Sequence, residues 1–271
     1  MKAPLKLAIG GLGAIGLAVA RRVDAGDLPG IVLAAVSARD EARARERISG
    51  MASRPELVGL TGLARHGDIV LESVPGRHFA EIAEPAIEQG RILMPLSVGQ
   101  LLTHMHLVER AKVTGARILV PTGALLGLDA VRAVAEGKVE SVRIVTRKPP
   151  RGLAGAPHLV RNSISVEGLT APLKVFEGSA REAIIGFPAN VNVAVALSLA
   201  GIGPDRTRIE IWADPGVDRN VHTIEVRSDS SDLTMTIANI PSEENPATGK
   251  VTALSAIAAL RRLTAPLVVG T

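Results

Sequence analysis

The chain has 271 residues, a formal net charge of +4, and neither cysteine nor tyrosine. Without cysteine there are no disulfides, cysteine-ligated zinc, iron–sulfur clusters or thiol nucleophiles, and without tyrosine there is no tyrosine–lysine pair to protonate a substrate. Hydrophobic residues make up 46% of the chain, which excludes a disordered protein, and the cations form no basic stripe of the kind that binds nucleic acid.

The first half of the chain alternates short apolar strands with helices. Strands that are apolar throughout are typical of a sheet covered on both faces, and the alternation predicts a parallel, doubly wound α/β sheet. The expected strands are 5–9, 31–36, 69–74, 92–96 and 118–120, and the expected helices are 14–23, 40–48, 77–88 and 101–113.

A glycine-rich turn joins the first strand to the first helix, with the pattern G-x-G-x-x-G. Gly11 allows the tight turn, Gly13 lets the backbone approach a pyrophosphate, and Gly16 lets helix and strand pack closely. Ala14 and Ile15 open the helix, whose N-terminus attracts phosphate. In this strand–turn–helix context the motif predicts a Rossmann domain that binds NAD or NADP.

The end of the second strand bears on the choice of cofactor. Enzymes that use NAD usually carry an acid there for the ribose hydroxyl, whereas this chain has Ser37, followed by Arg39. Serine and arginine suit a 2′-phosphate, which predicts that NADP is accepted, either alone or alongside NAD. Alternatively, Arg39 merely begins the charged helix.

After Gly127 the pattern changes to strict alternation of apolar and polar residues, which is typical of a sheet with one solvated face. We expect a Rossmann domain over 1–128 and an α/β domain with an open mixed, largely antiparallel sheet over 129–271. The last helix, within about 250–271, is expected to pack back onto the first domain. The expected strands are 139–147, 208–212, 221–226 and 233–237, and the expected helices are 189–200 and 250–260.

The stretch 183–203 carries no charge and is just long enough to cross a bilayer. It contains Pro188, Asn190 and Asn192 and lacks an aromatic belt or basic flank, so a buried helix is the better interpretation. The N-terminus has no long apolar segment followed by a cleavage site. We therefore expect a soluble cytoplasmic protein that contacts neither membrane nor nucleic acid.

Several motifs, in this order, resemble the L-aspartate dehydrogenases. These enzymes oxidise aspartate reversibly to iminoaspartate with NAD or NADP, which yields oxaloacetate and ammonia on hydrolysis and feeds NAD biosynthesis. The matching motifs are GLGAIG, the SVG at 97–99, PTGALLGLDA, TRKPP, FPANVNVA, DRNVHTIEV and NPATGKVTALS.

The resemblance implies a homodimer and assigns roles to individual residues. Ala124 and Asn190 match positions that hold the cofactor near the nicotinamide, and His222 matches the catalytic histidine of the family. The pattern alone favours other roles, because His222 shares a strand face with apolar residues and Asn190 lies where a helix cap is expected. The other five histidines fall outside the motifs, and no metal site is expected.

Candidates for the substrate carboxylates follow from position. Arg147 and Lys148 end a strand near the domain junction, and an arginine there would bind a carboxylate with two parallel bonds. Thr248 and Lys250 lie near the start of the last helix, whose N–H groups attract a carboxylate. Solvent-exposed cations and a simple helix cap are the competing interpretations.

Two other functions fit the same architecture. A different substrate would make the chain a reductase or dehydrogenase of the dihydrodipicolinate reductase or homoserine dehydrogenase type, because fold alone does not determine function. A non-catalytic NAD(P)H sensor would bind the dinucleotide without using His222.

Overall fold

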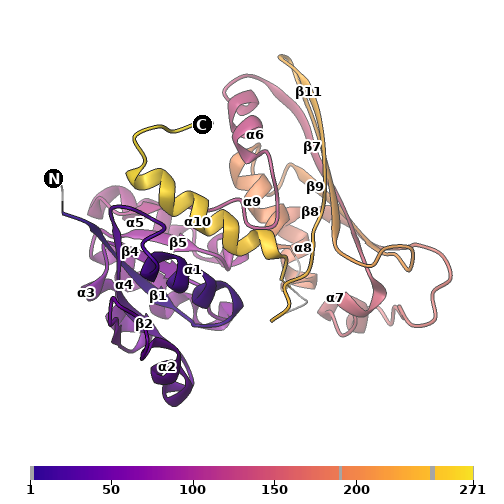
Figure 1. The fold of residues 1–271 in the computed structure, drawn as a ribbon. Helices are drawn as coiled ribbons and strands as arrows, with labels where there is room; N and C mark the ends of the chain where they lie inside the picture. The colour runs from indigo at the N-terminus through magenta and orange to yellow at the C-terminus, as the bar shows by residue number, and fades with distance from the viewer. Residues whose placement is uncertain (1–2, 189–190, 245–247, 271) are drawn as a thin grey trace. The chain divides into compact units, whose positions relative to one another are not determined.

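The computed structural model describes residues 3–188, 191–244 and 248–270 (Figure 1). The chain divides into unit 1, Met1–Pro121 with Thr252–Val268, and unit 2, Thr122–Val251 with Val269–Thr271. The first boundary therefore falls a few residues before Leu128.

Unit 1 contains a six-stranded sheet in the order β3-β2-β1-β4-β5-β6, with every paired strand parallel. The order reverses between β1 and β4, and in such sheets ligands bind at the carboxyl ends of the strands beside this switch point. The strands are β1 (Leu5–Gly10), β2 (Ile31–Ser37), β3 (Glu56–Leu57), β4 (Ile69–Glu72), β5 (Ile92–Pro95) and β6 (Arg117–Ile118).

Helices separate these strands, as the sequence pattern predicts, although one of them is shorter than expected. The segment 101–113 was expected to be one helix, but it begins as the 3₁₀ helix η3 and α5 starts only at His106. The elements are α1 (Ala14–Asp24), α2 (Glu41–Ile48), η1 (Leu60–Gly62), α3 (Leu63–His66), η2 (Gly76–His78), α4 (Phe79–Glu88), η3 (Val98–Thr103) and α5 (His106–Thr114).

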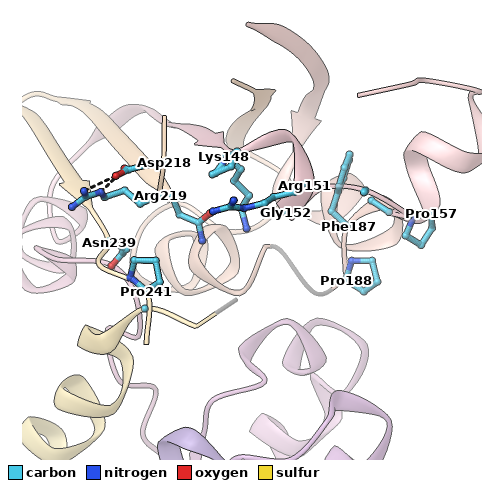
Figure 2. Close-up of a pocket in the computed structure, with 16 residues that line it drawn as sticks. Lys148, Arg151, Gly152, Pro157, Phe187, Pro188, Asp218, Arg219, Asn239 and Pro241 are labelled. Carbon is cyan, nitrogen blue, oxygen red and sulfur yellow. Dashed lines mark hydrogen bonds and ion pairs between the residues drawn. The ribbon is translucent and has the colours of Figure 1, made fainter. Parts of the chain in front are cut away.

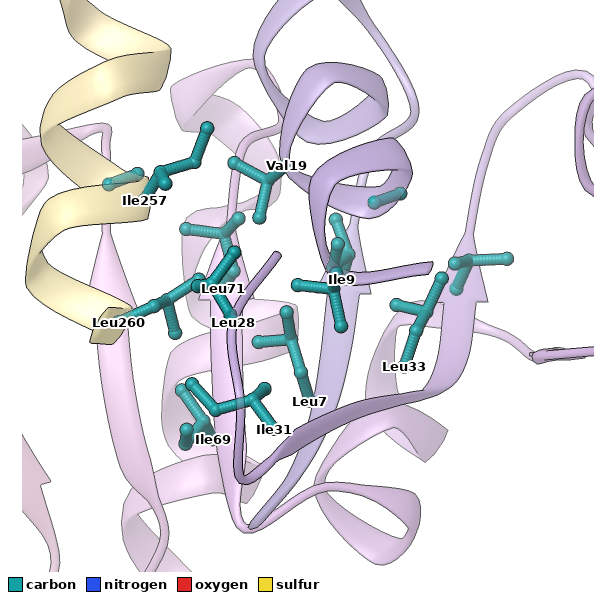
Figure 3. Packing of buried hydrophobic residues seen from close by; sticks show 14 of the residues in the cluster. Leu7, Ile9, Val19, Leu28, Ile31, Leu33, Ile69, Leu71, Ile257 and Leu260 are labelled. Carbon is teal, nitrogen blue, oxygen red and sulfur yellow. The ribbon is translucent and has the colours of Figure 1, made fainter. Parts of the chain in front are cut away.

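The last helix, α10 (Lys250–Thr264), completes the core of unit 1. Its buried Ala256, Ile257 and Leu260 belong to the same cluster as Leu7 of β1 and Val19 of α1 (Figure 3). Burying an Ile or Leu side chain contributes about 1.5–3 kcal/mol, so this helix stabilises a domain from which it is far away in sequence.

Unit 2 contains a five-stranded sheet in the order β11-β10-β7-β9-β8. Only β7 and β9 are parallel, and the other three pairs are antiparallel, which confirms the predicted mixed, largely antiparallel sheet. The strands are β7 (Val139–Lys148), β8 (Leu173–Ser179), β9 (Thr207–Ala213), β10 (Val221–Ser228) and β11 (Asp232–Ala238).

Helices cover one face of this sheet, where α6 and α9 contact each other and the strands β10 and β9 (Figure 1). The covered face is apolar, with Ile144, Ile209 and Ile224 buried, whereas the opposite face carries Arg143 ion-paired to Glu210. The helical elements are α6 (Leu128–Ala135), η4 (Pro150–Gly152), α7 (Pro157–Arg161), α8 (Ala180–Gly186) and α9 (Asn192–Ala200).

The uncharged stretch 183–203 is divided between two helices. Its first part completes α8, which begins with a capping box formed by Ser179 and Glu182, and its second part forms α9. Within residues 3–188, 191–244 and 248–270, no helix is long and apolar enough to cross a membrane.

Candidate functional site

Two glycines of the G-x-G-x-x-G motif, one in the loop after β1 and one in the first turn of α1, are required by the fold itself. Gly11 has a φ of +93°, and a Cβ there would lie 2.6 Å from the carbonyl oxygen of Ser73. A Cβ at Gly16 would overlap the carbonyl oxygen of Gly11. These positions therefore need glycine whether or not a ligand binds.

Gly13 differs from both, because nothing in the described chain requires glycine there. Its φ of −77° suits any residue, and a Cβ would have no described atom within 4 Å. Gly13 is the N-cap of α1, and no described side chain caps this helix. The open space therefore lies beside unsatisfied N–H groups, where Ala14 and Ile15 begin the helix, and it fits the pyrophosphate of a dinucleotide.

The carbonyl groups of the loop are bonded within the protein. Ser73 Oγ donates to the carbonyl oxygens of Gly10 and Gly11 at 2.8 and 3.0 Å. Arg47 of α2 donates from Nη1 to the carbonyl of Leu12. Because their acceptors are engaged in this way, these peptide groups are held in fixed orientations.

Glu72, the last residue of β4, is a buried carboxyl group that the sequence analysis did not single out. Its carboxylate accepts from Val74 N at 3.0 Å, from Ser97 N at 2.9 Å and from Ser97 Oγ at 3.0 Å. Burial raises the pKa of Glu72, and the hydrogen bonds from Ser97 and Val74 oppose that rise. Glu72 thus holds together the turns that follow β4 and β5, at the carboxyl ends of the strands, where ligands bind in sheets of this kind.

The two residues proposed to select the cofactor lie at and after the end of β2. Ser37 is buried and its carbonyl accepts from Gly11 N at 2.8 Å, so it adjoins the glycine loop. Arg39 is exposed, and Asp40 rather than Arg39 begins α2 by accepting from Arg43 N at 3.0 Å. Arg39 therefore lies in the loop that precedes the helix.

Unit 2 contains a cavity of about 370 Å³ (Figure 2). Its polar lining has more positive than negative charge, because Lys148, Arg151 and Arg219 outnumber Asp218. Asp218 is itself bound by Arg219 through two hydrogen bonds of 2.6 and 2.8 Å, which lower the pKa of that carboxyl. The remaining lining residues are Pro149, Gly152, Ala154, Gly155, Ala156, Pro157, Phe187, Pro188, Asn220, Asn239, Pro241 and Gly249.

Three of the lining residues come from neighbouring chain segments at one end of the sheet. Lys148 ends β7, Asn220 precedes β10, and Asn239 follows β11. The backbone N–H of Asn239 donates to the carbonyl of Asn220 at 2.8 Å, which continues the pairing of the two strands. The ends of these strands therefore bring together residues that lie far apart in the sequence.

His222 lies two residues further into the sheet and does not belong to the cavity lining. It is 2% exposed and pairs across the strands with Thr146, whose Oγ1 lies 3.0 Å from His222 Nδ1. Burial, followed by repulsion from the Lys148 charge, lowers the pKa of His222 to about 3. The imidazole is therefore neutral at pH 7, and Thr146 contacts its Nδ1 rather than its Nε2.

Lys148 is the cation most affected by this environment. It is 7% exposed, and burial lowers its pKa from 10.5 to about 8. Desolvation disfavours the charged ammonium of Lys148. An anionic ligand in the cavity would oppose this effect, because a nearby negative charge favours the protonated lysine, and the two charges would attract each other strongly where water is excluded.

Arg147 and Lys148 were both candidates for the substrate carboxylates, and the structure places them on opposite faces of the sheet. Successive residues of a strand alternate in direction. Arg147 donates from Nη1 to Asp214 at 2.9 Å and lies over the Trp212 ring with its guanidinium carbon 5.0 Å from the centroid. Of the two, only Lys148 lines the cavity, so the geometry favours Lys148 as the candidate for a substrate carboxylate.

Among the described residues, the other candidates for the substrate and the nicotinamide do not line the cavity either. Lys250 is exposed and ion-paired to Glu243 at 2.8 Å, which raises its pKa, and neither it nor Thr248 is part of the lining. The carbonyl of Ala124 accepts from Asn239 Nδ2 at 3.0 Å, next to the cavity. Asn190 lies outside the described residues.

The described residues contain no group of three or more His, Asp or Glu side chains suited to a metal ion.

Sequence comparisons identify relatives along the whole chain. Residues 11–121 match the family model described as homoserine dehydrogenase, NAD binding domain, and residues 129–263 match aspartate dehydrogenase, C-terminal. The chain is 54% identical to L-aspartate dehydrogenase 3 of Bordetella bronchiseptica, with 98% of each chain covered. It is 52% identical to L-aspartate dehydrogenase of Bradyrhizobium diazoefficiens, covering 98% of this chain and 94% of that one.

Solved structures share the fold. The crystal structure of aspartate dehydrogenase from Thermotoga maritima has a TM-score of 0.73 at 24% identity, with 98% of this chain and 99% of that chain covered. A structure of scyllo-inositol dehydrogenase from Lactobacillus casei with bound NAD(H) has a TM-score of 0.53 at 14% identity, with 95% and 86% covered. Unit 1 thus contains an NAD-binding domain, and the chain belongs to the L-aspartate dehydrogenase family of NAD(P)-dependent oxidoreductases.

Proposed function

We propose that this protein oxidises L-aspartate to iminoaspartate, reversibly, with NAD or NADP as the oxidant. The observation that carries the proposal is a buried lysine in a basic cavity, on a chain whose full length matches L-aspartate dehydrogenases. Released iminoaspartate either enters NAD biosynthesis or adds water to give oxaloacetate and ammonia.

The dinucleotide, when bound, supplies the hydride acceptor. Gly11, Gly13 and Gly16 would hold its pyrophosphate against the start of α1, together with the N–H groups of Ala14 and Ile15. Ser37 and Arg39 would contact the adenosine ribose, where Arg39 makes a 2′-phosphate acceptable. Ala124 and Asn190 are the positions proposed for the nicotinamide end.

Lys148 is proposed to bind a carboxylate of the substrate. An ammonium that is desolvated by its surroundings gains more from an incoming carboxylate than an exposed one does, because the local dielectric constant is low. The unequal charge of the cavity lining supports a dianionic substrate, with Arg151 available for a second carboxylate.

His222 is proposed to handle the proton, directly or through a water molecule. The hydride leaves Cα only when the amine is neutral, because the nitrogen lone pair must form the C=N bond, and the resulting iminium then loses a proton. The neutral imidazole accepts such a proton through Nε2. Burial is the main cause of the low pKa of His222, and repulsion from Lys148 lowers it further. A carboxylate beside Lys148 would offset that second contribution and so make the imidazole a better base.

We also propose that the protein is a cytoplasmic homodimer, on the strength of its family resemblance. Sedimentation of the purified protein tests the assembly, because a monomer at micromolar concentration contradicts it.

The test of the reaction is absorbance at the nicotinamide band, with L-aspartate and either NAD or NADP, and in reverse with oxaloacetate, ammonia and the reduced cofactor. We expect turnover in both directions, and an amino-acid screen should favour aspartate. Binding of NADH without turnover in either direction would identify a sensor and contradict the proposal.

A further inference from the structure

Asn239 carries an unsatisfied hydrogen-bond acceptor in the wall of the cavity. The residue is 4% exposed and lines the cavity together with Lys148 (Figure 2). Its Oδ1 is the buried side-chain polar atom that has no hydrogen-bond partner in the described part of the chain. A desolvated acceptor without a partner is costly, and this cost indicates a role for a ligand.

The orientation of this amide is determined by the protein. Nδ2 donates to the carbonyl oxygen of Ala124 at 3.0 Å, and the flipped amide would place two carbonyl oxygens against each other. Oδ1 therefore keeps its direction. A Cβ at Gly249 would approach it to 3.2 Å, so the glycine leaves space beside the acceptor.

The charged groups of the cavity differ from Asn239 in what they can bind. Lys148, Arg151 and Arg219 are donors and suit carboxylates, and the carboxylate of Asp218 is already bound by Arg219. Asn239 Oδ1 is thus the buried acceptor that is available to an N–H group of a ligand. An amino acid carries such a group next to its carboxylate.

We propose that Asn239 Oδ1 accepts a hydrogen bond from the reacting amino group of the substrate. This inference rests on the proposed function and assigns a specificity-determining residue to it. An uncharged acceptor holds an N–H while the nitrogen lone pair stays free to form the C=N bond, and it does not favour the unreactive ammonium as a carboxylate would. As the iminium forms, its N–H becomes a stronger donor, so the bond strengthens towards the transition state.

The experiment compares Asn239→Leu with Asn162→Leu, an exposed asparagine of the same unit. For Asn239→Leu we expect kcat/KM for L-aspartate to fall by about 10- to 100-fold, as for the loss of one buried hydrogen bond. The inhibition constant of succinate, a dicarboxylate without the amine, and the Kd for NADH should stay within about twofold. Asn162→Leu should match the wild type in all three measurements.

A second variant, Asn239→Asp, keeps an acceptor of similar shape but adds a charge that favours the ammonium form of the substrate. The pH at which kcat rises to its plateau should therefore shift upward, because kcat reports the ionisation of the bound substrate, and a merely structural residue would not produce this shift. This readout remains informative if Asn239→Leu fails to fold.

Two results would overturn the inference while the wild type oxidises aspartate. An equal loss for succinate and aspartate would make Asn239 a structural residue, and a weakened Kd for NADH would assign Oδ1 to the carboxamide of the cofactor. A wild type that leaves aspartate unchanged would instead refute the proposed function.

Discussion

In unit 1 the candidate site consists of backbone, with glycines at 11, 13 and 16 and the first peptide groups of α1 within six consecutive residues. In unit 2 the candidate site consists of side chains, and Lys148, Arg151, Asn220 and Asn239 come from segments spread over ninety residues or so of sequence. The first site is proposed to bind the pyrophosphate that all dinucleotides share. The second is proposed to distinguish one small acid from another, a task in which charge and hydrogen-bond direction matter more than shape.

The largest effect is expected at His222. Replacing it with Gln should reduce kcat by about 10²- to 10⁴-fold, as for the loss of a general acid–base group, with the Kd for NADH nearly unchanged. Stopped-flow and equilibrium binding measurements separate the two quantities. Turnover within a few-fold of the wild type would show that His222 is only a buried core residue.

The same variant has a consequence for stability. Because the folded-state pKa of His222 is about 3 and its ordinary value is 6.5, the unfolded chain binds a proton in this interval that the folded chain does not. The wild type therefore loses stability as pH falls from about 6.5 towards 3. His222→Gln should show a smaller loss of Tm over this range, and an equal loss would contradict the low pKa.

The glycine loop offers a pair of matched variants that separate ligand binding from packing. Gly13→Ala should keep the Tm of the wild type but weaken binding of NAD or NADP by about 10- to 100-fold, because the added methyl occupies the space left for the pyrophosphate. Gly16→Ala should lower the Tm as well, since its Cβ overlaps the Gly11 carbonyl. Unchanged nucleotide affinity in Gly13→Ala would mean that the open space serves no ligand.

These differences explain which features were predictable from the sequence. The Rossmann half could be predicted because its signals are local: apolar strands, a glycine pattern and helix boundaries. In unit 2 the alternating strands and the mixed sheet were also predictable. The strand β8 and the helices α6, α7 and α8 were missed, because each is only five to eight residues long and offers too few repeats of its pattern to stand out.

The site of unit 2 could be predicted only in part. Strand period alone places Arg147 and Lys148 on opposite faces, and applying it would have shown that only one of them can face the cavity. Asn239 and Glu72 belong to no sequence motif, and their importance comes from their surroundings in space. Asn239 Oδ1 has no hydrogen-bond partner among the described residues, and the Glu72 carboxylate accepts from three donors.

Arg147 and Lys148, which are neighbours on β7, allow a residue that lines the cavity to be compared with one that does not. Lys148→Met should raise KM for L-aspartate by about 10- to 100-fold, whereas Arg147→Met should leave KM unchanged and lower the stability by about 1 kcal/mol through loss of its ion pair. In the wild type, KM should rise above about pH 8 as Lys148 loses its proton, and this rise should disappear in Lys148→Met. Equal effects of the two substitutions on KM would refute the assignment of Lys148 to the substrate.

The smallest effect is expected at Glu72 of unit 1, whose carboxylate accepts hydrogen bonds from the turns that follow β4 and β5. Glu72→Gln places an amide N–H against the donors of Val74 or Ser97, which should lower the free energy of unfolding, measured in urea, by about 1–2 kcal/mol.

The stability of the wild type should also depend on pH. Because the pKa of Glu72 is raised, the folded protein binds more protons than the unfolded chain above the ordinary carboxyl pKa, so the wild type loses stability as pH rises through this range. The uncharged glutamine has no such loss, and the gap between the two proteins should narrow with rising pH. The matched control is Glu88→Gln. Glu88 is an exposed carboxyl paired with Arg110, which lowers the pKa of Glu88, so the small contribution of Glu88 to stability should instead fade as pH falls. A gap that widens with pH would show that the hydrogen bonds of Ser97 and Val74 outweigh burial and hold Glu72 ionised.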